Sequence, residues 1–394
     1  MFIQLSSDSG NFKLKVVLDK TTQVTLPSVI KQEFKKPIVD EGSIATKVEQ
    51  LYKNLTVNIT SPGIKRDGMY SIGERANHDA TKAKNMDITL GNKHLHDIPV
   101  IANLAIIAVH AVQKEFKNKN QLPATIAVES SIAASIPASE WTKENAAHLE
   151  QRFTGKPESP STHVVIVYVG DQQVTVTIKI TKAKVTQEGV PALYALVSAP
   201  DDILRDFLKL YNDNPTISKM KPKDFATKKG ILVDIGSGTV EFIHTRGMNP
   251  VTANCRGAKH GVGHAAEQAA TMLKEELNGK LDINRQRFDE IYQDKNNNYY
   301  DLATQFMAEA QYNEAESILT ETQKMYSNIG GDADFIMVFG GGSITFKPDM
   351  YNEILEFTKQ TRLMLLWIPE DYAIDLNRHG LDILHQKVFF KEGA

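Results

Sequence analysis

The most informative segment of the chain is Gly230-Ile231-Leu232-Val233-Asp234-Ile235-Gly236-Ser237-Gly238-Thr239-Val240-Glu241-Phe242. Its apolar first half predicts a buried strand, its small residues predict a tight turn, and its last residues predict a second strand. The N-terminus has the same order, because residues 2–5 precede a small polar cluster and residues 12–18 alternate between apolar and polar. The sequence therefore predicts two strand–turn–strand units about one domain apart.

A turn made of Gly, Ser, Thr and Asp can bind phosphate. Successive backbone N–H groups point into one space, and small residues let a phosphate approach them. Ser237 and Thr239 add hydroxyl donors, and Asp234 can hold Mg²⁺ through water. Tight hairpins also use Gly and Asp for backbone reasons alone. Two such turns in one chain favour the phosphate-binding interpretation.

A third glycine-rich site is Gly340-Gly341-Gly342-Ser343, which follows a predicted buried strand over 334–339. Three consecutive glycines let the backbone lie flat against a planar ligand such as a nucleobase or a ribose. The alternative is a flexible loop between a strand and a helix. The buried strand before it and the two other small-residue turns favour a ligand site.

Composition limits the class of protein. The chain has 394 residues, enough for two or three domains, and its formal net charge of −3 gives no reason to expect direct binding to nucleic acid or anionic membrane through a basic surface. The single cysteine, Cys255, excludes an internal disulfide and a thiolate metal cluster, and it fits a reducing compartment. The N-terminus does not resemble a secretion signal, and the apolar run from Ile98 to Val112 is too short to span a bilayer. We expect a soluble, cytoplasmic protein.

The remaining elements follow from periodicity and turn residues. The turn formers at 155–161 predict a domain boundary. Residues 201–211 predict an amphipathic helix capped at Asp201 or Asp202. Further expectations are a buried helix over 98–116, a hairpin of 163–169 and 173–180, helices over 258–278 and 281–328, and a buried strand over 363–368.

Other chemistry-bearing patterns fail. His94 with His96, and His260 with His264, have no nearby cysteine or well-spaced acid to complete a metal site, so they are expected to be surface or core histidines. The sequence contains neither a G-x-x-x-x-G-K-[ST] P-loop nor a G-x-S-x-G nucleophile elbow. The lysine-rich stretch 219–229 is expected to be a solvated loop.

Taken in order, the small-residue loops resemble the motif series of the actin, sugar-kinase and heat-shock-chaperone ATPase superfamily, and most of all the ParM-like plasmid-segregation actins of bacteria. The resemblance implies an α/β, actin-like fold with two related domains around a nucleotide cleft. It implies domain I over 1–160 with 371–394 returning to it, and domain II over 161–370 with a helical insertion at about 256–330. The matching stretches are phosphate-1 at 5–13, a connecting motif at 127–141, phosphate-2 at 232–242, the adenosine motif at 337–343 and a second connecting helix at 371–386.

The resemblance also implies the site. ATP or GTP with Mg²⁺ is the expected cofactor, Asp234 and Asp8 are the expected metal contacts, and Glu188 in Gln187-Glu188-Gly189-Val190-Pro191 is the expected acid that orients the attacking water. One departure is that Ser6 stands where the family has its first acid, seven residues before the lysine, so Asp8 is the candidate substitute. The adenine-side contact is expected near Arg285 or Arg287, and Arg287 is the residue chosen. The full set of expected nucleotide contacts is Asp8, Ser9, Gly10, Asn11, Lys13, Gly236, Ser237, Gly238, Thr239, Gly340, Gly341, Gly342, Ser343 and Arg287.

The implied function is nucleotide-driven filament assembly with hydrolysis-triggered disassembly that segregates plasmid DNA. The expected partners are further copies of the chain and an adaptor protein bound to a centromere-like DNA site, with no direct nucleic-acid or membrane contact. Two alternatives remain. A small-molecule kinase of the same superfamily would need a catalytic base and a sugar-binding loop, and a cell-shape or membrane-associated actin would need an amphipathic anchor helix. Neither feature is evident in the sequence.

Overall fold

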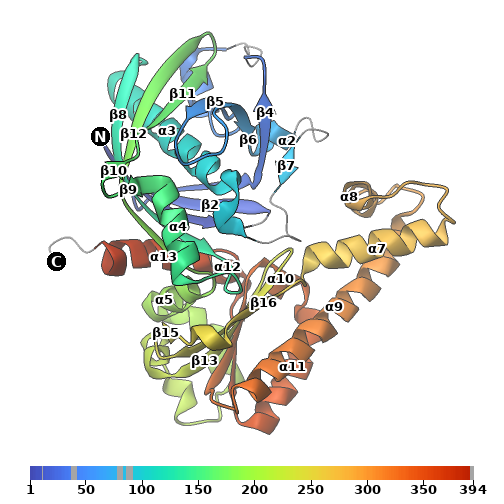
Figure 1. Ribbon diagram of the computed structural model, residues 1–394. Helices are drawn as coiled ribbons and strands as arrows, with labels where there is room; N and C mark the ends of the chain where they lie inside the picture. The colour runs from blue at the N-terminus through green and yellow to red at the C-terminus, as the bar shows by residue number, and fades with distance from the viewer. Residues whose placement is uncertain (11, 37–41, 78–82, 86–91, 391–394) are drawn as a thin grey trace. The chain divides into compact units, whose positions relative to one another are not determined.

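The predicted strand–turn–strand unit of residues 230–242 is observed as β13 (Lys229–Ile235) and β14 (Val240–Arg246), which pair antiparallel. The computed structural model describes residues 1–10, 12–36, 42–77, 83–85 and 92–390 (Figure 1). Its contacts divide the chain into two units. Unit 1 comprises Met1–Pro191 and Arg378–Ala394, and unit 2 comprises Ala192–Asn377.

Unit 1 is built on one large mixed sheet, with ten strands among the described residues. In spatial order these are β3 (Thr22–Pro27), β2 (Lys13–Leu18), β1 (Phe2–Ser9), β8 (Thr125–Ile136), β12 (Gln172–Gln187), β11 (His163–Val169), β5 (Thr56–Thr60), β6 (Gly68–Ile72), β4 (Val29–Glu33) and β7 (Lys84–Asn85). The neighbours β1, β8 and β12 are parallel, and the other pairs are antiparallel. The carboxyl ends of β1, β8 and β12 therefore meet at one edge, where ligands commonly bind to parallel strands.

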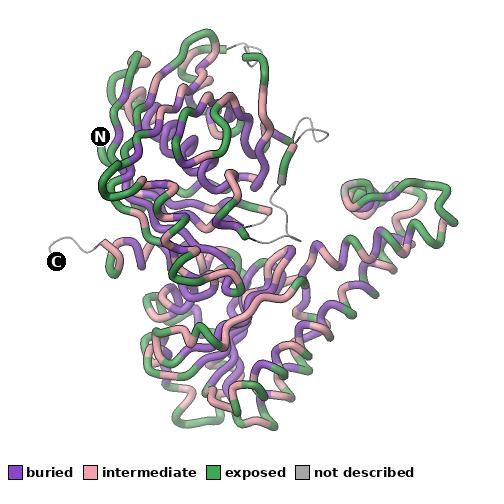
Figure 2. Tube along the Cα trace, viewed as in Figure 1, coloured by how far each residue is buried: buried purple, intermediate pink, exposed green. Residues whose placement is uncertain are grey.

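The predicted buried helix is α3 (Asp97–Lys119), and its residues from Ile98 to Val112 are all buried against the sheet (Figure 2). Of the helices in the described ranges, the segment Ile98–Lys119 alone is apolar and long enough to cross a membrane, but 83% of its most apolar window is buried inside the protein. It is therefore the core helix of unit 1. Among the described residues, the other helical segments of this unit are α1 (Ile44–Glu49), α2 (Glu74–Asn77), η2 (Lys93–Leu95), α4 (Lys143–Thr154), most of α13 (Leu376–Leu384) and the π-helical turn η7 (His385–Phe389).

Unit 2 has a smaller sheet in which β13 lies centrally. The spatial order is β15 (Asn249–Pro250), β14, β13, β17 (Phe335–Phe339) and β18 (Met364–Trp367), and β16 (Arg256–Ala258) also pairs with β14. Strand β17 is parallel to both β13 and β18. The predicted buried strands over 334–339 and 363–368 are therefore confirmed, and β17 leads directly into the glycine-rich turn at 340.

The helical insertion of unit 2 consists of α7 (Val262–Glu276), α8 (Arg285–Gln293) and α9 (Tyr300–Asn328). Helices α7 and α9 run side by side (Figure 1), and small alanines of α7 pack with Phe288, Ile291 and Met307 in a separate apolar cluster. The predicted helices over 258–278 and 281–328 are thus observed with a break between α8 and α9. The other α-helices described in this unit are α5 (Val190–Ser198), α6 (Arg205–Leu210), α10 (Gly341–Thr345), α11 (Lys347–Thr361) and α12 (Glu370–Ala373), and its 3₁₀ helices include η4 (Ile217–Lys219), η5 (Pro222–Thr227) and η6 (Thr252–Asn254).

The division between the units differs from the predicted boundary near residue 160. Strands β11 and β12 form the predicted hairpin, but β12 pairs in parallel with β8 along most of its length, so the hairpin belongs to the sheet of unit 1. The first division falls after Pro191 instead, and the return to unit 1 begins at Arg378 instead of residue 371. The turn formers at 155–161 make a small loop with the two-residue strands β9 (Gly155–Lys156) and β10 (Ser159–Pro160) inside unit 1.

The helix predicted over 201–211 is also different. A 3₁₀ turn, η3 (Asp201–Leu204), precedes α6, and the residue at its N-cap is Pro200, so neither Asp201 nor Asp202 is the cap. Both aspartates lie in the first turn, where a carboxylate interacts favourably with the exposed N–H groups. The sequence pattern identified the right charges but not the residue at which the helix begins.

Candidate functional site

The turn between β13 and β14 is tight and is held by the start of α7. The Gly236 N–H donates to the Thr239 carbonyl at 2.9 Å, and the Gly263 N–H donates to the Ser237 carbonyl at 2.6 Å. A Cβ at Gly261, where φ is +139°, would lie 2.6 Å from the Gly236 carbonyl oxygen. This close approach requires glycine, and it fixes the turn against the helix.

The same turn presents backbone donors. Within the described ranges, no hydrogen-bond acceptor is assigned to the N–H groups of Ser237 and Gly238. The Gly238 carbonyl is occupied, since it accepts from His264 Nε2 at 3.0 Å. A turn with unpaired N–H groups and bonded carbonyls is suited to an anion.

The second histidine of this region is also bonded to protein. His260 Nδ1 lies 3.1 Å from Glu314 Oε2, which also accepts from the Gly261 N–H at 3.1 Å. Among the residues that the structure describes, no group of three or more His, Cys, Asp or Glu side chains could hold a metal. His260 and His264, which were expected to be surface or core histidines, are both partly buried and bonded to protein groups.

Asp234 joins the β13–β14 turn to the glycine-rich turn after β17. The Asn377 amide donates to Asp234 Oδ2 at 2.5 Å. A Cβ at Gly340, where φ is +90°, would lie 2.5 Å from Asp234 Oδ1, and a Cβ at Gly342 would lie 2.4 Å from the Ile235 side chain. Two of the three glycines therefore let the second turn pack on the end of β13.

The middle glycine differs from its neighbours. A Cβ at Gly341 would have nothing within 4 Å, so this position faces open space. Ser343 is buried, and its hydroxyl donates to the Gly340 carbonyl at 2.8 Å, which closes the first turn of α10. The predicted ligand contacts at Gly340, Gly342 and Ser343 are thus positions that shape the turn, and Gly341 has an open face.

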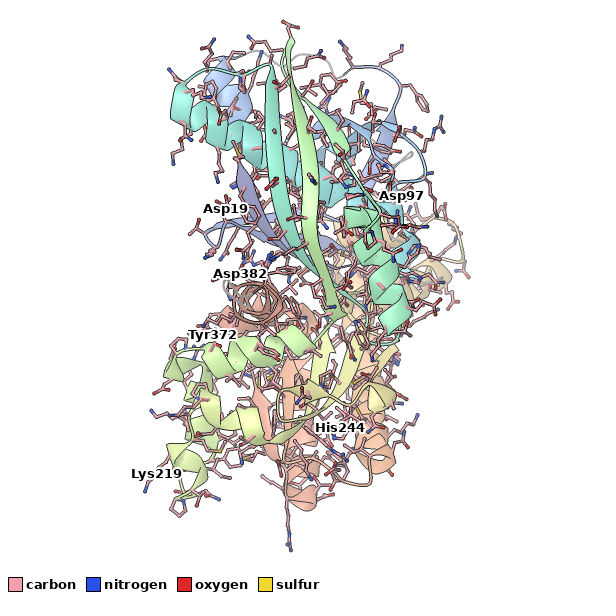
Figure 3. All side chains as sticks on the ribbon, turned by 60° about the vertical axis from the view of Figure 1, so that its left-hand side comes forward. Asp19, Asp97, Lys219, His244, Tyr372 and Asp382 are labelled. Carbon is pink, nitrogen blue, oxygen red and sulfur yellow. The ribbon has the colours of Figure 1, made fainter. Side chains whose placement is uncertain are left out.

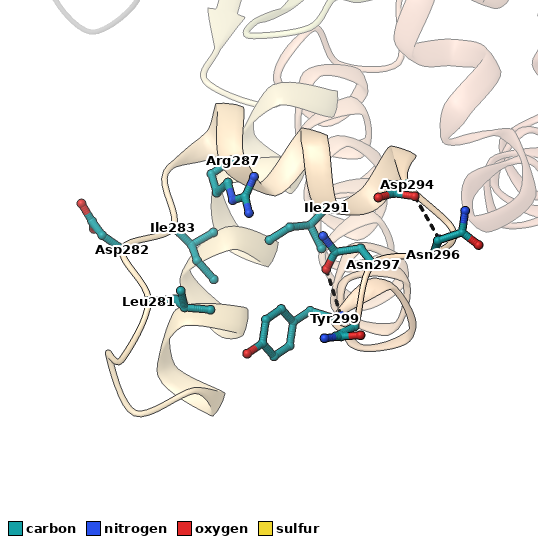
Figure 4. Close-up of a pocket in the computed structure, with 10 residues that line it drawn as sticks. Leu281, Asp282, Ile283, Arg287, Ile291, Asp294, Asn296, Asn297 and Tyr299 are labelled. Atoms are coloured by element: carbon teal, nitrogen blue, oxygen red, sulfur yellow. Dashed lines mark hydrogen bonds between the residues drawn. The ribbon is translucent and has the colours of Figure 1, made fainter.

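The two candidate arginines lie in different surroundings on α8. Arg287 Nη1 pairs with Glu290 at 2.7 Å, and Arg287 lines a cavity of about 400 Å³ with Leu281, Ile291 and Tyr299 (Figure 4). Arg285 instead lies against α7, because a Cβ at Gly263 would be 2.7 Å from its guanidinium. Gly263 bonds directly to Ser237, so the structure brings Arg285, and not the predicted Arg287, next to the β13–β14 turn.

In unit 1, the end of β1, the start of β2 and the turn between them carry the other predicted phosphate contacts. Asp8 is half-buried, Ser9 is buried and Lys13 is exposed. The Ser9 hydroxyl lies 3.0 Å from that of Ser7, which donates to Asn103 Oδ1 at 2.8 Å. A Cβ at Gly10 would lie 2.9 Å from the Lys13 carbonyl, so this turn is also tight. The predicted contact Asn11 lies outside the described residues.

Ser6, at the position where the resemblance led us to look for an acid, is fully buried and faces the C-terminal helix. Its hydroxyl donates to Asp382 Oδ1 at 3.1 Å and lies 3.0 Å from His385 Nδ1, while His385 Nε2 lies 2.8 Å from the Ser131 hydroxyl. Figure 3 shows Asp382 on α13. Burial raises the pKa of Asp382 and lowers the pKa of His385 to about 4. Ser6 is therefore part of a buried polar network.

Glu188 follows β12 directly, and its N–H donates to the Ile136 carbonyl at the end of β8 at 2.8 Å. Its carboxylate forms an ion pair with Lys93, a residue of η2 that is 4% exposed. Burial raises the pKa of Glu188, the positive charge of Lys93 opposes that shift, and Asp8 and Glu140 add to it. Lys93 could not be singled out from the sequence, because no local pattern marks a single lysine before an apolar helix.

Residues 232–352 match the family model of the C-terminal domain of archaeal MreB-like actin homologues. No curated protein sequence matches the chain significantly.

Solved structures match the chain along nearly its whole length. The actin-like protein Alp7A has a TM-score of 0.68 and 17% identity, over 98% of this chain and 96% of that one. The archaeal actin homologue Ta0583 has a TM-score of 0.61 and 14% identity, over 96% and 97%. Bacillus thuringiensis ParM with ATP has a TM-score of 0.58 and 14% identity, over 98% of both chains. The chain therefore has the predicted actin-like fold.

Proposed function

We propose that this actin-like chain binds ATP or GTP with Mg²⁺, hydrolyses the nucleotide and assembles into filaments. The observation that carries the proposal is the packing of two turns beside Asp234. It brings an anion-accepting turn, 236–239, against a glycine-rich turn, 340–343, with one open glycine. The first turn suits phosphates and the second suits the flat face of a nucleoside.

The proposed chemistry needs positioning and charge neutralisation more than covalent steps. The carboxylate of Asp234 would hold the water shell of Mg²⁺, as one or two carboxylates do in many nucleotide sites. The ion would supply positive charge to the phosphate oxygens. The N–H groups of Ser237 and Gly238, with the hydroxyls of Ser237 and Thr239, would bind those oxygens.

Unit 1 is proposed to supply the acid. Glu188 is anchored at the end of a parallel strand, and a carboxylate there could accept a hydrogen bond from water and orient it for attack. The resemblance of residues 5–13 to the phosphate-1 motif of the actin superfamily assigns Asp8 to the metal, and Gly10 and Lys13 to the phosphates. Arg285, which lies next to Gly263, is a better candidate for a nucleotide contact than Arg287.

Assembly is proposed because the chain matches ParM and Alp7A along almost its full length. A head-to-tail contact that does not close on itself propagates into a filament. Plasmid segregation in the cytoplasm, through an adaptor protein bound to a centromere-like DNA site, is the finer proposal. The net charge of −3 agrees with an indirect link to DNA.

One experiment tests the proposal. Purified protein is mixed with Mg²⁺ and ATP, GTP, ADP or no nucleotide, and high-speed sedimentation, light scattering and phosphate release are followed together. We expect assembly above a threshold concentration with a triphosphate, accompanied by phosphate release. The variant Asp234→Ala lacks the proposed metal-binding carboxylate and is expected to abolish hydrolysis. A protein that stays monomeric under every nucleotide condition would refute the filament proposal, and one that releases no phosphate would refute the hydrolysis proposal.

A further inference from the structure

We propose that Lys93 is a positioning residue for hydrolysis, and that it acts by fixing the direction of the Glu188 carboxylate through their buried ion pair. This inference rests on the proposed function, because it gives Glu188 its role toward water. Lys93 belongs to none of the loops that resemble nucleotide-binding motifs, and it lies 95 residues before Glu188 in the chain.

Both partners of the ion pair are held by their backbones. The Lys93 N–H donates to Glu140 Oε2 at 2.6 Å, and the carbonyl of the next residue, His94, accepts from Arg152 of α4 at 3.0 Å. The Glu188 N–H is bonded to Ile136 of β8. The lysine and the glutamate therefore project from two fixed turns, and their side chains are 4% and 13% exposed.

Stability alone is a poor reason for such a pair. Two charges removed from water lose solvation that their attraction only partly returns, so apolar residues of similar volume often stabilise a protein as well or better. A glutamate on a turn has rotatable bonds, however, and can orient water only when its carboxylate direction is fixed. A buried ammonium group on one oxygen fixes that direction and leaves the other oxygen for a water.

A double-mutant cycle tests the inference. The variants are Lys93→Met, Lys93→Gln, Glu188→Gln and the combination of Lys93→Met with Glu188→Gln. Lys119→Met, at an exposed lysine of α3, is the matched control. For each variant, phosphate release at saturating Mg·ATP, affinity for a fluorescent ATP analogue and the thermal unfolding midpoint are measured.

We expect Lys93→Met to slow turnover by roughly 10-fold to 100-fold without weakening nucleotide affinity, a smaller loss than the roughly 10²-fold or more expected when the acid–base group itself is removed. In the Glu188→Gln background, the same change should alter turnover by less than about 2-fold, because effects that pass through one residue are not additive. The control should match the parent.

Other outcomes overturn the inference. Equal losses from Lys93→Met in both backgrounds would mean that the lysine acts independently of Glu188. Weaker nucleotide affinity in both backgrounds would make Lys93 a ligand contact. Failure of both Lys93→Met and Lys93→Gln to fold would make it a structural residue. If the parent protein releases no phosphate, the proposed hydrolysis is refuted. If the parent and Lys93→Met release phosphate at the same rate, only this inference is refuted.

Discussion

The side-chain amide of Asn377 donates a 2.5 Å hydrogen bond to the carboxylate of Asp234, and so links the last residue of unit 2 to the end of its central strand. We predict that Asn377→Ala lowers turnover by roughly 10-fold. Loss of a hydrogen bond that orients a metal-binding carboxylate typically lowers metal affinity or activity by about 10-fold to 100-fold. Phosphate release measures the loss. Asn352→Ala, at an exposed site on α11, is the control, and an Asn377→Ala protein with parental turnover would show that the bond does not orient Asp234.

The glycine turn offers a matched pair of substitutions. Gly340→Ala should destabilise the protein by about 1–3 kcal/mol, since it places a Cβ 2.5 Å from Asp234 Oδ1 at a positive φ. Gly341→Ala should leave the free energy of unfolding unchanged or raise it by up to about 1 kcal/mol, because its Cβ meets open space and alanine favours the helix. Urea denaturation gives both values. Equal destabilisation by the two alanines would contradict this account of the turn.

Gly341→Ala also probes the ligand. If the open face of Gly341 lies against a nucleoside, the added methyl group should weaken ATP affinity while the fold stays intact. Binding of a fluorescent ATP analogue measures the effect. Undiminished affinity would move the nucleoside away from this face of the turn.

Glu188→Gln should slow phosphate release by roughly 10²-fold or more and leave nucleotide binding and assembly intact, because a positioned acid–base group contributes to the chemical step. Filaments of this variant should persist after those of the parent have disassembled. Light scattering and phosphate release, recorded on the same sample, decide the question. Normal phosphate release would assign the catalytic role to another acid, and Glu129 and Glu241 would be tested next.

The Ser6 position predicts a contrast with Asp8. Ser6→Asp should not supply a metal ligand, because it would bury a second carboxylate beside Asp382, and like charges at close range are costly. It should lower the unfolding midpoint instead. Asp8→Ala should fold normally and weaken Mg²⁺-dependent turnover to a smaller extent than Asp234→Ala. An Asp8→Ala protein with parental affinity and turnover would show that Asp8, a residue of β1, has no part in binding the metal.

His385 predicts a pH dependence of stability. Its pKa is about 4 in the folded protein against an ordinary value of 6.5, so the unfolded chain binds the proton more tightly. The stabilisation is complete above about pH 6.5 and is lost as the pH falls toward 4, and the difference corresponds to about 3 kcal/mol. Asp382, whose pKa burial raises, acts in the opposite sense.

The variant His385→Gln isolates this effect. Its free energy of unfolding should fall less steeply than that of the parent between pH 6.5 and 4. His379→Gln, at an exposed histidine of the preceding helix α13, should follow the parent. Parallel curves for His385→Gln and the parent would remove His385 as the source.

Local patterns predicted the parts of the fold that depend on neighbouring residues. The unit 230–242 is one example, because apolar alternation and small turn residues specify two paired strands without help from the rest of the chain. The hairpin of β11 and β12 was predicted for the same reason. The sheet that it joins was not, since the pairing of β12 with β8 depends on residues far apart in sequence.

The site shows the same limit. The glycines at 236 and 340 could be singled out because only small residues suit such turns. Lys93 could not, because its partner is 95 residues away. The choice between Arg285 and Arg287 depends on which face of α8 each occupies, and two positions on a helix differ by about 200°. A helix start assigned from sequence is too uncertain to decide that angle.

The hydrogen bond from the Gly263 N–H to the Ser237 carbonyl couples the start of α7 to the β13–β14 turn. The helix has 15 residues, so it extends about 22 Å from the turn that we assign to phosphate. A tilt of about 5° at its first residues would move the far end of α7 by about 2 Å, given the helix length of about 22 Å. The α8 and α9 segments packed on α7 would move with it. Occupancy of a few atoms at residues 237–239 could therefore be transmitted as a visible displacement at the tip of the insertion.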